Sequence, residues 1–242
     1  MADEARTTEL ETPDGPMPVY EVVPEGTAKG AVVVIQEVFG VNHHIQDVTR
    51  RFAAAGYHAV APHLFHRTGS PELGYDDFSK VMPHMQALTD EKLVLDVDAV
   101  VAHLAAAGWG TPQTALVGFC FGGRISFLVA TARPLGAAVG FYGGGIVSAR
   151  FPLFPALVER AGDLKAPWLG LFGDLDESIP VDDVERLRNE LDASGTPVPH
   201  EIVRYPEAGH GFHCDAREGH FHEASAADAW QKTLDWLEQH LQ

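Results

Sequence analysis

The sequence predicts an α/β fold in which a mostly parallel central sheet carries helices on both faces. Strand-like and helix-like apolar patterns alternate along the 242 residues, as they do in crossover units of a parallel sheet. Residues 31–36 (AVVVIQ) form a continuous apolar run, which is typical of a strand buried on both faces. The turn at residues 13–16 (PDGP) separates the first two strand segments and predicts an antiparallel hairpin at the amino terminus.

The strand segments are short, rich in β-branched and aromatic residues, and bounded by Gly, Pro or Asp. Ligands of such sheets bind at the carboxyl ends of the strands, so the residues that follow each strand are the candidates for chemistry. Strands are expected at residues 7–12, 17–23, 31–36, 58–61, 114–118, 137–142, 168–173 and 201–205.

Helices are expected where apolar residues recur every three or four positions. In residues 90–107, Val94, Val97 and Val101 share one apolar stripe, and Gly108 ends the helix. The expected helices are residues 45–55, 77–85, 90–107, 122–132, 181–193 and 224–240.

Composition and charge exclude several classes of protein. The formal net charge of −17 repels phosphate backbones and anionic lipid, so we expect no nucleic-acid and no membrane partner. Residues 1–11 lack the basic and apolar parts of a signal peptide, and two cysteines are too few for a disulfide framework. We therefore expect one cytoplasmic domain spanning residues 1–242, as a monomer or a homodimer.

A nucleophile elbow is predicted where the strand at residues 114–118 meets the next helix. Residues 118–123 (GFCFGG) place glycines two positions before and after Cys120, as a sharp strand-to-helix turn requires. The amino end of the helix favours a thiolate at Cys120. The backbone N–H of Phe121 would then face a developing oxyanion.

Two further strand ends supply an acid and a histidine. Asp176 follows the strand at residues 168–173, and His210 follows the strand at residues 201–205. The chain order of nucleophile, acid and histidine is that of α/β-hydrolases. His210 would take the thiol proton and later activate water, and Asp176 would orient its imidazole. Asp174 competes with Asp176 for the role of the acid.

Together with residues 36–42 (QEVFGVN) and 141–143 (FYG), these motifs resemble the dienelactone hydrolase (carboxymethylenebutenolidase) family of α/β-hydrolases. The resemblance implies the α/β-hydrolase fold, and the short connection after residue 142 leaves no room for a large cap domain. It implies hydrolysis of a small ester or lactone through an acyl-enzyme. The alternative is a catalytically retired scaffold that binds a small ligand.

The resemblance also implies roles for individual residues. Glu37 would pair with the cysteine and govern when the thiol becomes a thiolate, and the N–H of Val38 would be the second oxyanion donor. Tyr142 and Phe39 would contact the substrate.

One position departs from the family. Four residues past the catalytic histidine the family carries an arginine that holds a substrate carboxylate, and here that residue is Cys214. We expect the Cys214 side chain on the pocket wall near His210, and a preference for uncharged substrates unless Arg217 or Arg67 supplies the missing charge.

A dense cluster of histidines and a cysteine follows the last strand, so a metal site must be considered. Its spacing matches no standard zinc pattern, and His210 already has a role in the triad. We expect no metal and no cofactor. The cluster comprises His210, His213, Cys214, His220 and His222.

Overall fold

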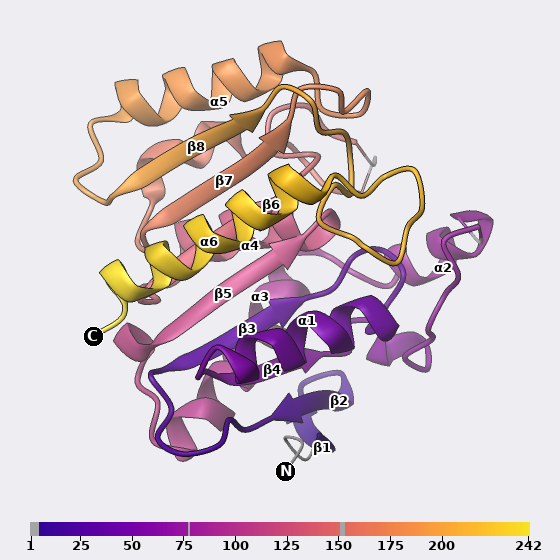
Figure 1. The fold of residues 1–242 in the computed structure, drawn as a ribbon. Helices are drawn as coiled ribbons and strands as arrows, with labels where there is room; N and C mark the ends of the chain where they lie inside the picture. Colours follow the sequence, from indigo (N-terminus) through magenta and orange to yellow (C-terminus); the bar gives the residue numbers. More distant parts are fainter. Residues whose placement is uncertain (1–4, 77, 151–152) are drawn as a thin grey trace.

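The computed structural model describes residues 5–76, 78–150 and 153–242, which build one eight-stranded sheet (Figure 1). The strand order is β1-β2-β4-β3-β5-β6-β7-β8. Strand β2 pairs antiparallel with β1 and β4, and all other neighbours are parallel. The predicted hairpin and parallel sheet are therefore confirmed. The strands are β1 Arg6–Thr12, β2 Gly15–Val22, β3 Ala31–Ile35, β4 His58–Pro62, β5 Thr114–Phe119, β6 Ala137–Phe141, β7 Trp168–Gly173 and β8 His200–Tyr205.

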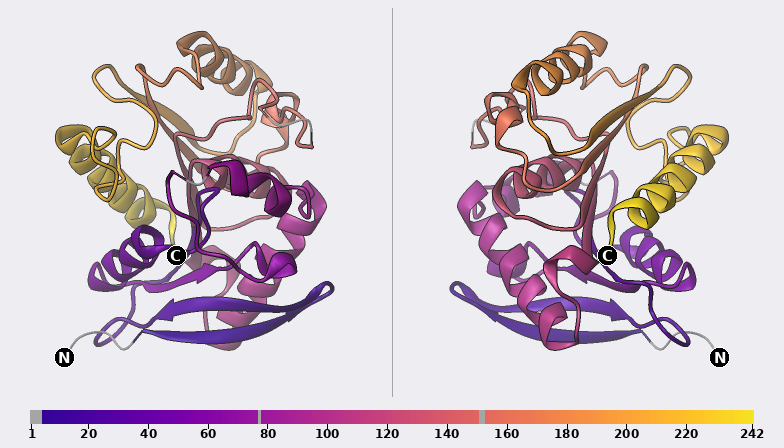
Figure 2. Two further views of the ribbon diagram at one scale, coloured as in Figure 1. Left: turned by 90° about the vertical axis from the view of Figure 1, so that its right-hand side faces the viewer. Right: turned by 90° about the vertical axis from the view of Figure 1, so that its left-hand side faces the viewer.

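Helices cover both faces of the sheet. Helices α1 and α6 lie on one face, and α3, α4 and α5 lie on the other (Figure 2). Within the described residues, no helix is long and apolar enough to span a membrane. The α-helices are α1 His43–Ala54, α2 Val81–Met85, α3 Asp90–Ala106, α4 Phe121–Ala132, α5 Val181–Ser194 and α6 Glu223–His240, and the 3-10 helices are η1 His66–Thr68, η2 Phe78–Lys80, η3 Thr111–Gln113 and η4 Val158–Asp163.

The strands and long helices lie within two residues of their predicted bounds. Helix α1 begins earlier than expected because the side chain of Asn42 accepts a hydrogen bond from the N–H of Ile45 (3.2 Å) and caps the helix. The single helix expected at residues 77–85 was wrong, because the described part divides into η2 and α2. Pro83 has no N–H with which to continue the helix. Asp77 lies outside the described residues.

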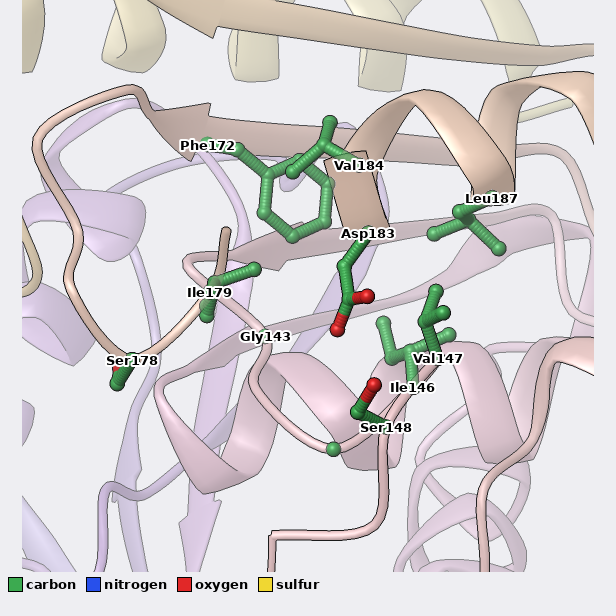
Figure 3. A pocket seen from close by; sticks show the side chains of 11 residues that line it. Gly143, Ile146, Val147, Ser148, Phe172, Ser178, Ile179, Asp183, Val184 and Leu187 are labelled. Atoms are coloured by element: carbon green, nitrogen blue, oxygen red, sulfur yellow. The ribbon is translucent and has the colours of Figure 1, made fainter. Parts of the chain in front are cut away.

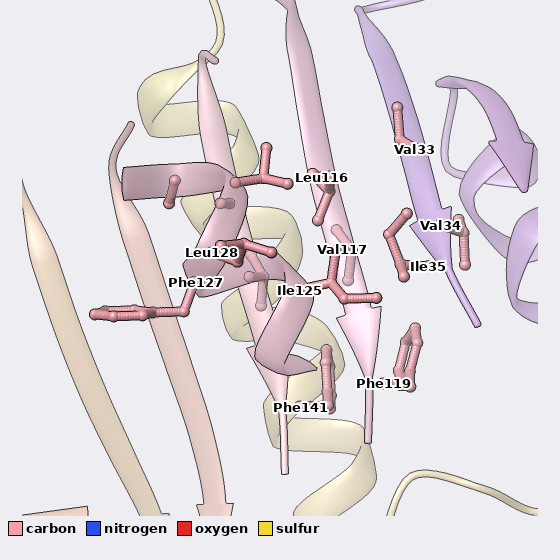
Figure 4. Close-up of a cluster of buried hydrophobic side chains, with 14 of the residues drawn as sticks. Val33, Val34, Ile35, Leu116, Val117, Phe119, Ile125, Phe127, Leu128 and Phe141 are labelled. Atoms are coloured by element: carbon pink, nitrogen blue, oxygen red, sulfur yellow. The ribbon is translucent and has the colours of Figure 1, made fainter. Parts of the chain in front are cut away.

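Buried apolar side chains fill the space between the central strands and the helices that cover them. All residues of β3 and β5 are buried, and Ile125 and Leu128 of α4 pack over these strands (Figure 4). A close-packed interior of this kind deforms little. A rigid core therefore supports the loops that follow the carboxyl ends of β3, β5, β6, β7 and β8 at one edge of the sheet.

Candidate active site

The turn between β5 and α4 has the geometry expected of a nucleophile elbow. Cys120 has φ 55° and ψ −112°, a backbone conformation that a residue with a side chain rarely adopts and that costs free energy. Its N–H donates to the carbonyl of Phe141 (3.0 Å), and its own carbonyl accepts from Gly123. These contacts hold the strained residue at the junction of strand and helix.

Two glycines of the motif are required by space. A Cβ atom on Gly118 would lie 1.9 Å from the carbonyl oxygen of Gly122, and one on Gly122 would lie 2.4 Å from the carbonyl oxygen of Ile35. Backbone atoms cannot yield by that much. The glycines therefore let α4 start directly against β5 and β3, and this contact brings Cys120 to the sheet edge.

His210 and Asp176 meet beside the elbow. Nδ1 of His210 lies 2.6 Å from Oδ2 of Asp176, and the carboxylate is almost completely buried. The other oxygen of Asp176 accepts from the backbone N–H (2.8 Å) and the hydroxyl (2.6 Å) of Ser178. Both oxygens are thus engaged, and the carboxylate fixes one side of the imidazole.

The competing carboxylate has another partner. Asp174 accepts two hydrogen bonds from the guanidinium of Arg204, both at 2.8 Å. This bidentate pair is strong and geometrically specific, and it holds the Asp174 carboxylate away from His210. The geometry favours Asp176 as the acid.

The imidazole of His210 sits in an anionic environment. Burial alone would lower its pKa, but the charge on the Cys120 sulfur and hydrogen bonds to Asp176 and Cys120 outweigh burial and raise the pKa to about 10. The imidazolium form is therefore stabilised at neutral pH by the two groups that flank the ring.

Two cavities lie beside these residues. Cys120 lines a cavity of about 20 Å³ with Val38, Phe121 and Phe78. His210 and Asp176 line a larger cavity of about 560 Å³. A third cavity, of about 20 Å³, lies behind the acid loop between the segment after β6 and α5 (Figure 3). It has room for about one water-sized group, and neither Cys120 nor His210 lines it.

Sequence reasoning missed two residues of this site. Arg150 lines both the Cys120 cavity and the His210 cavity, and Phe78 lines the Cys120 cavity with about half of its surface exposed. Arg150 lies in the segment after β6, and the rule that strand ends carry function could have drawn attention to that segment. No sequence pattern points to Phe78, because η2 lies far along the chain from any strand end.

Glu37 is buried below the site. Its side chain is fully buried, and neither carboxylate oxygen has a hydrogen-bond partner among the described residues. The pairing with Cys120 that the resemblance implies is therefore not formed in this structure. The carboxylate influences the titration of His44, Tyr75 and Cys214, so it faces this buried polar region.

Cys214 is buried in this structure, and its expected place on the pocket wall stays a prediction. Its side chain exposes no surface, and its sulfur lies 3.1 Å from the hydroxyl of Tyr75. Burial, together with the charge of Glu37, raises the pKa of the Cys214 thiol to about 12. Cys214 therefore packs as a neutral thiol beside Tyr75 in this conformation.

The expected substrate contact of Tyr142 also stays a prediction. Tyr142 has φ 39° and is fully buried, because the chain turns sharply after β6 and directs the ring inward. The centre of its ring lies 5.1 Å from the centre of the His210 ring and 5.3 Å from the centre of the Phe212 ring. Phe39 is 5% exposed and packs edge-on against Tyr75. Its contact with substrate remains a prediction.

A pair of buried histidines makes the fold sensitive to acid. Burial, aided by the positive charge of His44, lowers the pKa of His213 to about 3, and burial also lowers the pKa of His44. An unfolded histidine titrates near about 6.5. The contribution of these neutral histidines to the free energy of unfolding is therefore fully present above about pH 6.5. It is lost as the pH falls towards about 3, because over this range only the unfolded chain takes up these protons.

We expect His213→Phe to reduce this loss. The ring of His213 lies 5.3 Å from that of Phe119 and 5.0 Å from that of Phe141, so phenylalanine suits the site. Urea denaturation at about pH 7 and about pH 4.5 should show a smaller drop in unfolding free energy for the variant. An equal drop in both proteins would contradict the assignment.

Within the described part of the chain, no group of three His, Cys, Asp or Glu side chains could hold a metal ion. In this cluster, Nδ1–H of His220 donates to the carbonyl of His210 (3.0 Å), and the side chain of His222 caps α6 by accepting from the N–H of Ser225. These contacts give the histidines structural roles. That the enzyme needs no metal remains a prediction.

The chain was compared with known proteins. The model of the dienelactone hydrolase family matches residues 17–241. A Salmonella typhimurium protein named "Putative carboxymethylenebutenolidase" is 40% identical over 98% of this chain and 87% of its own length. The carboxymethylenebutenolidase of Rhodococcus opacus is 29% identical over 93% of this chain and 87% of its own length.

A solved structure agrees with these matches. The crystal structure of a "Putative Dienelactone Hydrolase" from Klebsiella pneumoniae superimposes with a TM-score of 0.89 and 38% identity, covering 99% of this chain and all of that one. The protein is thus a carboxylic-ester hydrolase that acts on a small-molecule ester or lactone, with the α/β-hydrolase fold, and it belongs to the dienelactone hydrolase family.

Proposed function

We propose that this enzyme hydrolyses small esters or lactones with Cys120 as nucleophile, His210 as general base and acid, and Asp176 as the orienting carboxylate. The observation that carries the proposal is that His210 is bonded to Asp176 at 2.6 Å, while the Cys120 sulfur lies near enough for its charge to raise the pKa of the same imidazole. A base within reach of a nucleophile and oriented by a third group is the arrangement that activates a weak nucleophile. An intact arrangement of this kind disfavours the alternative, a catalytically inactive scaffold that only binds a small ligand.

The first half-reaction forms an acyl-enzyme. With the thiol proton on His210, the Cys120 sulfur attacks the carbonyl carbon, and the carbonyl π electrons move to oxygen. The backbone N–H of Phe121, which lies at the first turn of α4, and that of Val38 would stabilise this oxyanion. When the oxyanion collapses, the C–O bond breaks, and His210 gives its proton to the departing alkoxide oxygen.

The second half-reaction regenerates the thiol. His210, now neutral, takes a proton from water as the water oxygen attacks the thioester carbon. The second oxyanion uses the same two N–H donors. Its collapse breaks the C–S bond, releases the carboxylic acid and returns the proton from His210 to the sulfur. Asp176 keeps the imidazole in the tautomer that both proton transfers need.

Glu37 would control the charge on Cys120. A buried carboxylate beside a thiol either takes its proton or opposes its negative charge. Because Glu37 has no hydrogen-bond partner among the described residues, its side chain is available for such a role. We retain this assignment as part of the proposal.

A panel of short-chain aryl esters and simple lactones, dienelactone included, tests the function. We expect a burst of released phenol equal to the enzyme concentration, followed by slower turnover as the thioester hydrolyses. Iodoacetamide should abolish both phases by alkylating Cys120. Turnover that survives complete alkylation of Cys120, or no hydrolysis of any ester or lactone, would contradict the proposal.

A further inference from the structure

Arg124 is a buried arginine that has no part in the proposed bond-breaking steps. It lies on α4, one turn after Cys120, and only 2% of its surface is exposed. Arginine is almost never buried to this degree unless it is paired, because removing the charge from water is costly. The positions of its partners therefore show what this side chain holds together.

The guanidinium of Arg124 joins α4 to two other parts of the chain. Two of its nitrogens donate to the two carboxylate oxygens of Asp90, in the first turn of α3, at 2.6 and 3.0 Å. Its Nε donates to the carbonyl of Gly145 (3.3 Å), and its Nη2 donates to the carbonyl of Pro155 (2.7 Å). Both carbonyls belong to the segment that follows β6, here called the wall segment (residues 143–150 and 153–155).

Glycines let the wall segment approach Arg124 closely. Gly145 has φ 90°, a conformation that favours glycine, and a Cβ atom there would lie 3.2 Å from Cδ of Arg124. A Cβ atom on Gly143 would lie 3.0 Å from the backbone nitrogen of Arg124. No side chain of these two residues separates the wall segment from α4, so the carbonyl of Gly145 can reach the guanidinium.

The wall segment forms one side of the cavity beside Cys120. Gly144 and Arg150 line this cavity. In the chain, Gly144 directly precedes the first carbonyl that Arg124 binds, and Arg150 lies between the two. The hydrogen bonds of Arg124 therefore fix the backbone on both sides of the residues that face Cys120.

An aromatic contact reinforces the same arrangement. The centre of the Phe154 ring lies 5.2 Å from the guanidinium carbon of Arg124 and 5.1 Å from the centre of the Phe121 ring. Phe154 is buried, and Phe121 follows Cys120 and lines its cavity. The wall segment thus packs on the residue whose N–H would stabilise the oxyanion.

The proposed chemistry assigns this cavity to the acyl group. Phe121 and Val38, whose N–H groups would hold the carbonyl oxygen, line it together with Cys120, and its volume is only about 20 Å³. The departing oxygen must instead face His210, which lines the larger cavity. The acyl chain therefore extends along the wall that Arg124 holds in place.

We propose that Arg124 is a positioning residue that limits the length of the acyl chain. By holding the wall segment against α4, it keeps that wall close to Cys120 and restricts the enzyme to esters of short acids. The inference rests on the proposed function, because the roles of Cys120 and His210 define the acyl side. Arg124 acts through the wall segment and does not touch the substrate.

The 4-nitrophenyl esters of acetate, butyrate and hexanoate test this role, because they share one leaving group. Wild type should have its highest kcat/KM for the acetate ester. The double variant Arg124→Met with Asp90→Asn removes the hydrogen bonds without leaving a carboxylate that has lost its partner. It should lower the acetate-to-hexanoate ratio of kcat/KM by about 10-fold or more, since a fitted pocket discriminates by about that factor for a single methylene group.

A second arginine–aspartate pair provides the matched control. Arg133, the C-cap of α4, donates to the two carboxylate oxygens of Asp98 in α3, each at 2.7 Å. Among the described residues, it forms no hydrogen bond to the wall segment. Arg133→Met with Asp98→Asn removes the same kind of pair between the same two helices, so it should keep the wild-type ratio.

Gly145→Ala tests the wall segment with Arg124 left intact. A methyl group at φ 90° is strained and would press on Cδ of Arg124, so it should displace the wall segment and lower the ratio in the same direction. In each of these variants, iodoacetamide should alkylate Cys120 at the wild-type rate, because the hydrogen bonds of the elbow itself involve only backbone atoms.

Several results would overturn the inference. One is a wild type that hydrolyses the hexanoate ester as well as the acetate ester. Another is an unchanged ratio in both the Arg124 double variant and Gly145→Ala, or an equal fall in the Arg133 control. An equal loss for all three esters with slower alkylation of Cys120 would show that Arg124 supports the elbow instead of the wall.

Failure of this inference can be told from failure of the proposed function. If wild type hydrolyses the acetate ester in a Cys120-dependent manner while the variants keep its selectivity, only the role of Arg124 is wrong. If wild type hydrolyses none of the three esters, the proposed function fails as well.

Discussion

Replacing Cys120 with alanine is expected to lower kcat/KM for an activated aryl ester by about 10³-fold or more. The variant loses the group that we propose forms the thioester, so binding and oxyanion stabilisation would remain. Steady-state kinetics measures the loss. Circular dichroism and thermal unfolding should match wild type, because the side chain is only partly buried and alanine fits the same turn.

The second cysteine provides the control. Cys214→Ser keeps a small polar group beside Tyr75, so it should retain most of the activity. If Cys120→Ala retained more than about a tenth of wild-type activity, or if Cys214→Ser lost as much as Cys120→Ala, the nucleophile assignment would be wrong.

The second large effect concerns the histidine and its acid. His210→Ala should cost about 10²- to 10⁴-fold in kcat, the usual contribution of a general base. Asp176→Asn should also be damaging, because an amide in place of the carboxylate can present the wrong partner to Nδ1 of His210 and disfavour the required tautomer. The loss should be smaller than for His210→Ala.

Asp174→Asn is the matched control for Asp176→Asn. It makes the same chemical change two residues away, where the carboxylate pairs with Arg204. We expect near wild-type kcat and at most a small loss of stability from this partly exposed pair. A large loss of kcat in Asp174→Asn, together with near wild-type kcat in Asp176→Asn, would show that Asp174 is the carboxylate that orients His210.

The arrangement of strands and of the three triad residues could be predicted because both depend on local patterns. Continuous apolar runs mark buried parallel strands, and their carboxyl ends must meet at one edge. Cys120, Asp176 and His210 each follow such a strand, so their proximity follows from topology alone. The choice of Asp176 over Asp174 rested on the resemblance of residues 176–180 to the family, and the pairing of Asp174 with Arg204 on β8 agrees with it.

Side-chain directions in the long loops could not be predicted. Cys214 and Tyr142 are adjacent to the site along the chain, but both side chains are buried. Cys214 contacts the hydroxyl of Tyr75, and Tyr142 packs against the ring of Phe212. Arg150 and Phe78 join the site from segments without a recognised motif. These placements depend on how separate loops pack against one another, which periodicity does not encode.

The most direct test of the central claim is to trap the acyl-enzyme and locate it. Enzyme mixed with excess aryl acetate and quenched during the burst should carry one acetyl group, and peptide mass spectrometry should assign it to Cys120 as a thioester that hydroxylamine removes. Absence of the adduct in Cys120→Ala would complete the result. An acetyl group on another side chain, or wild-type turnover with no thioester at Cys120, would contradict a cysteine nucleophile.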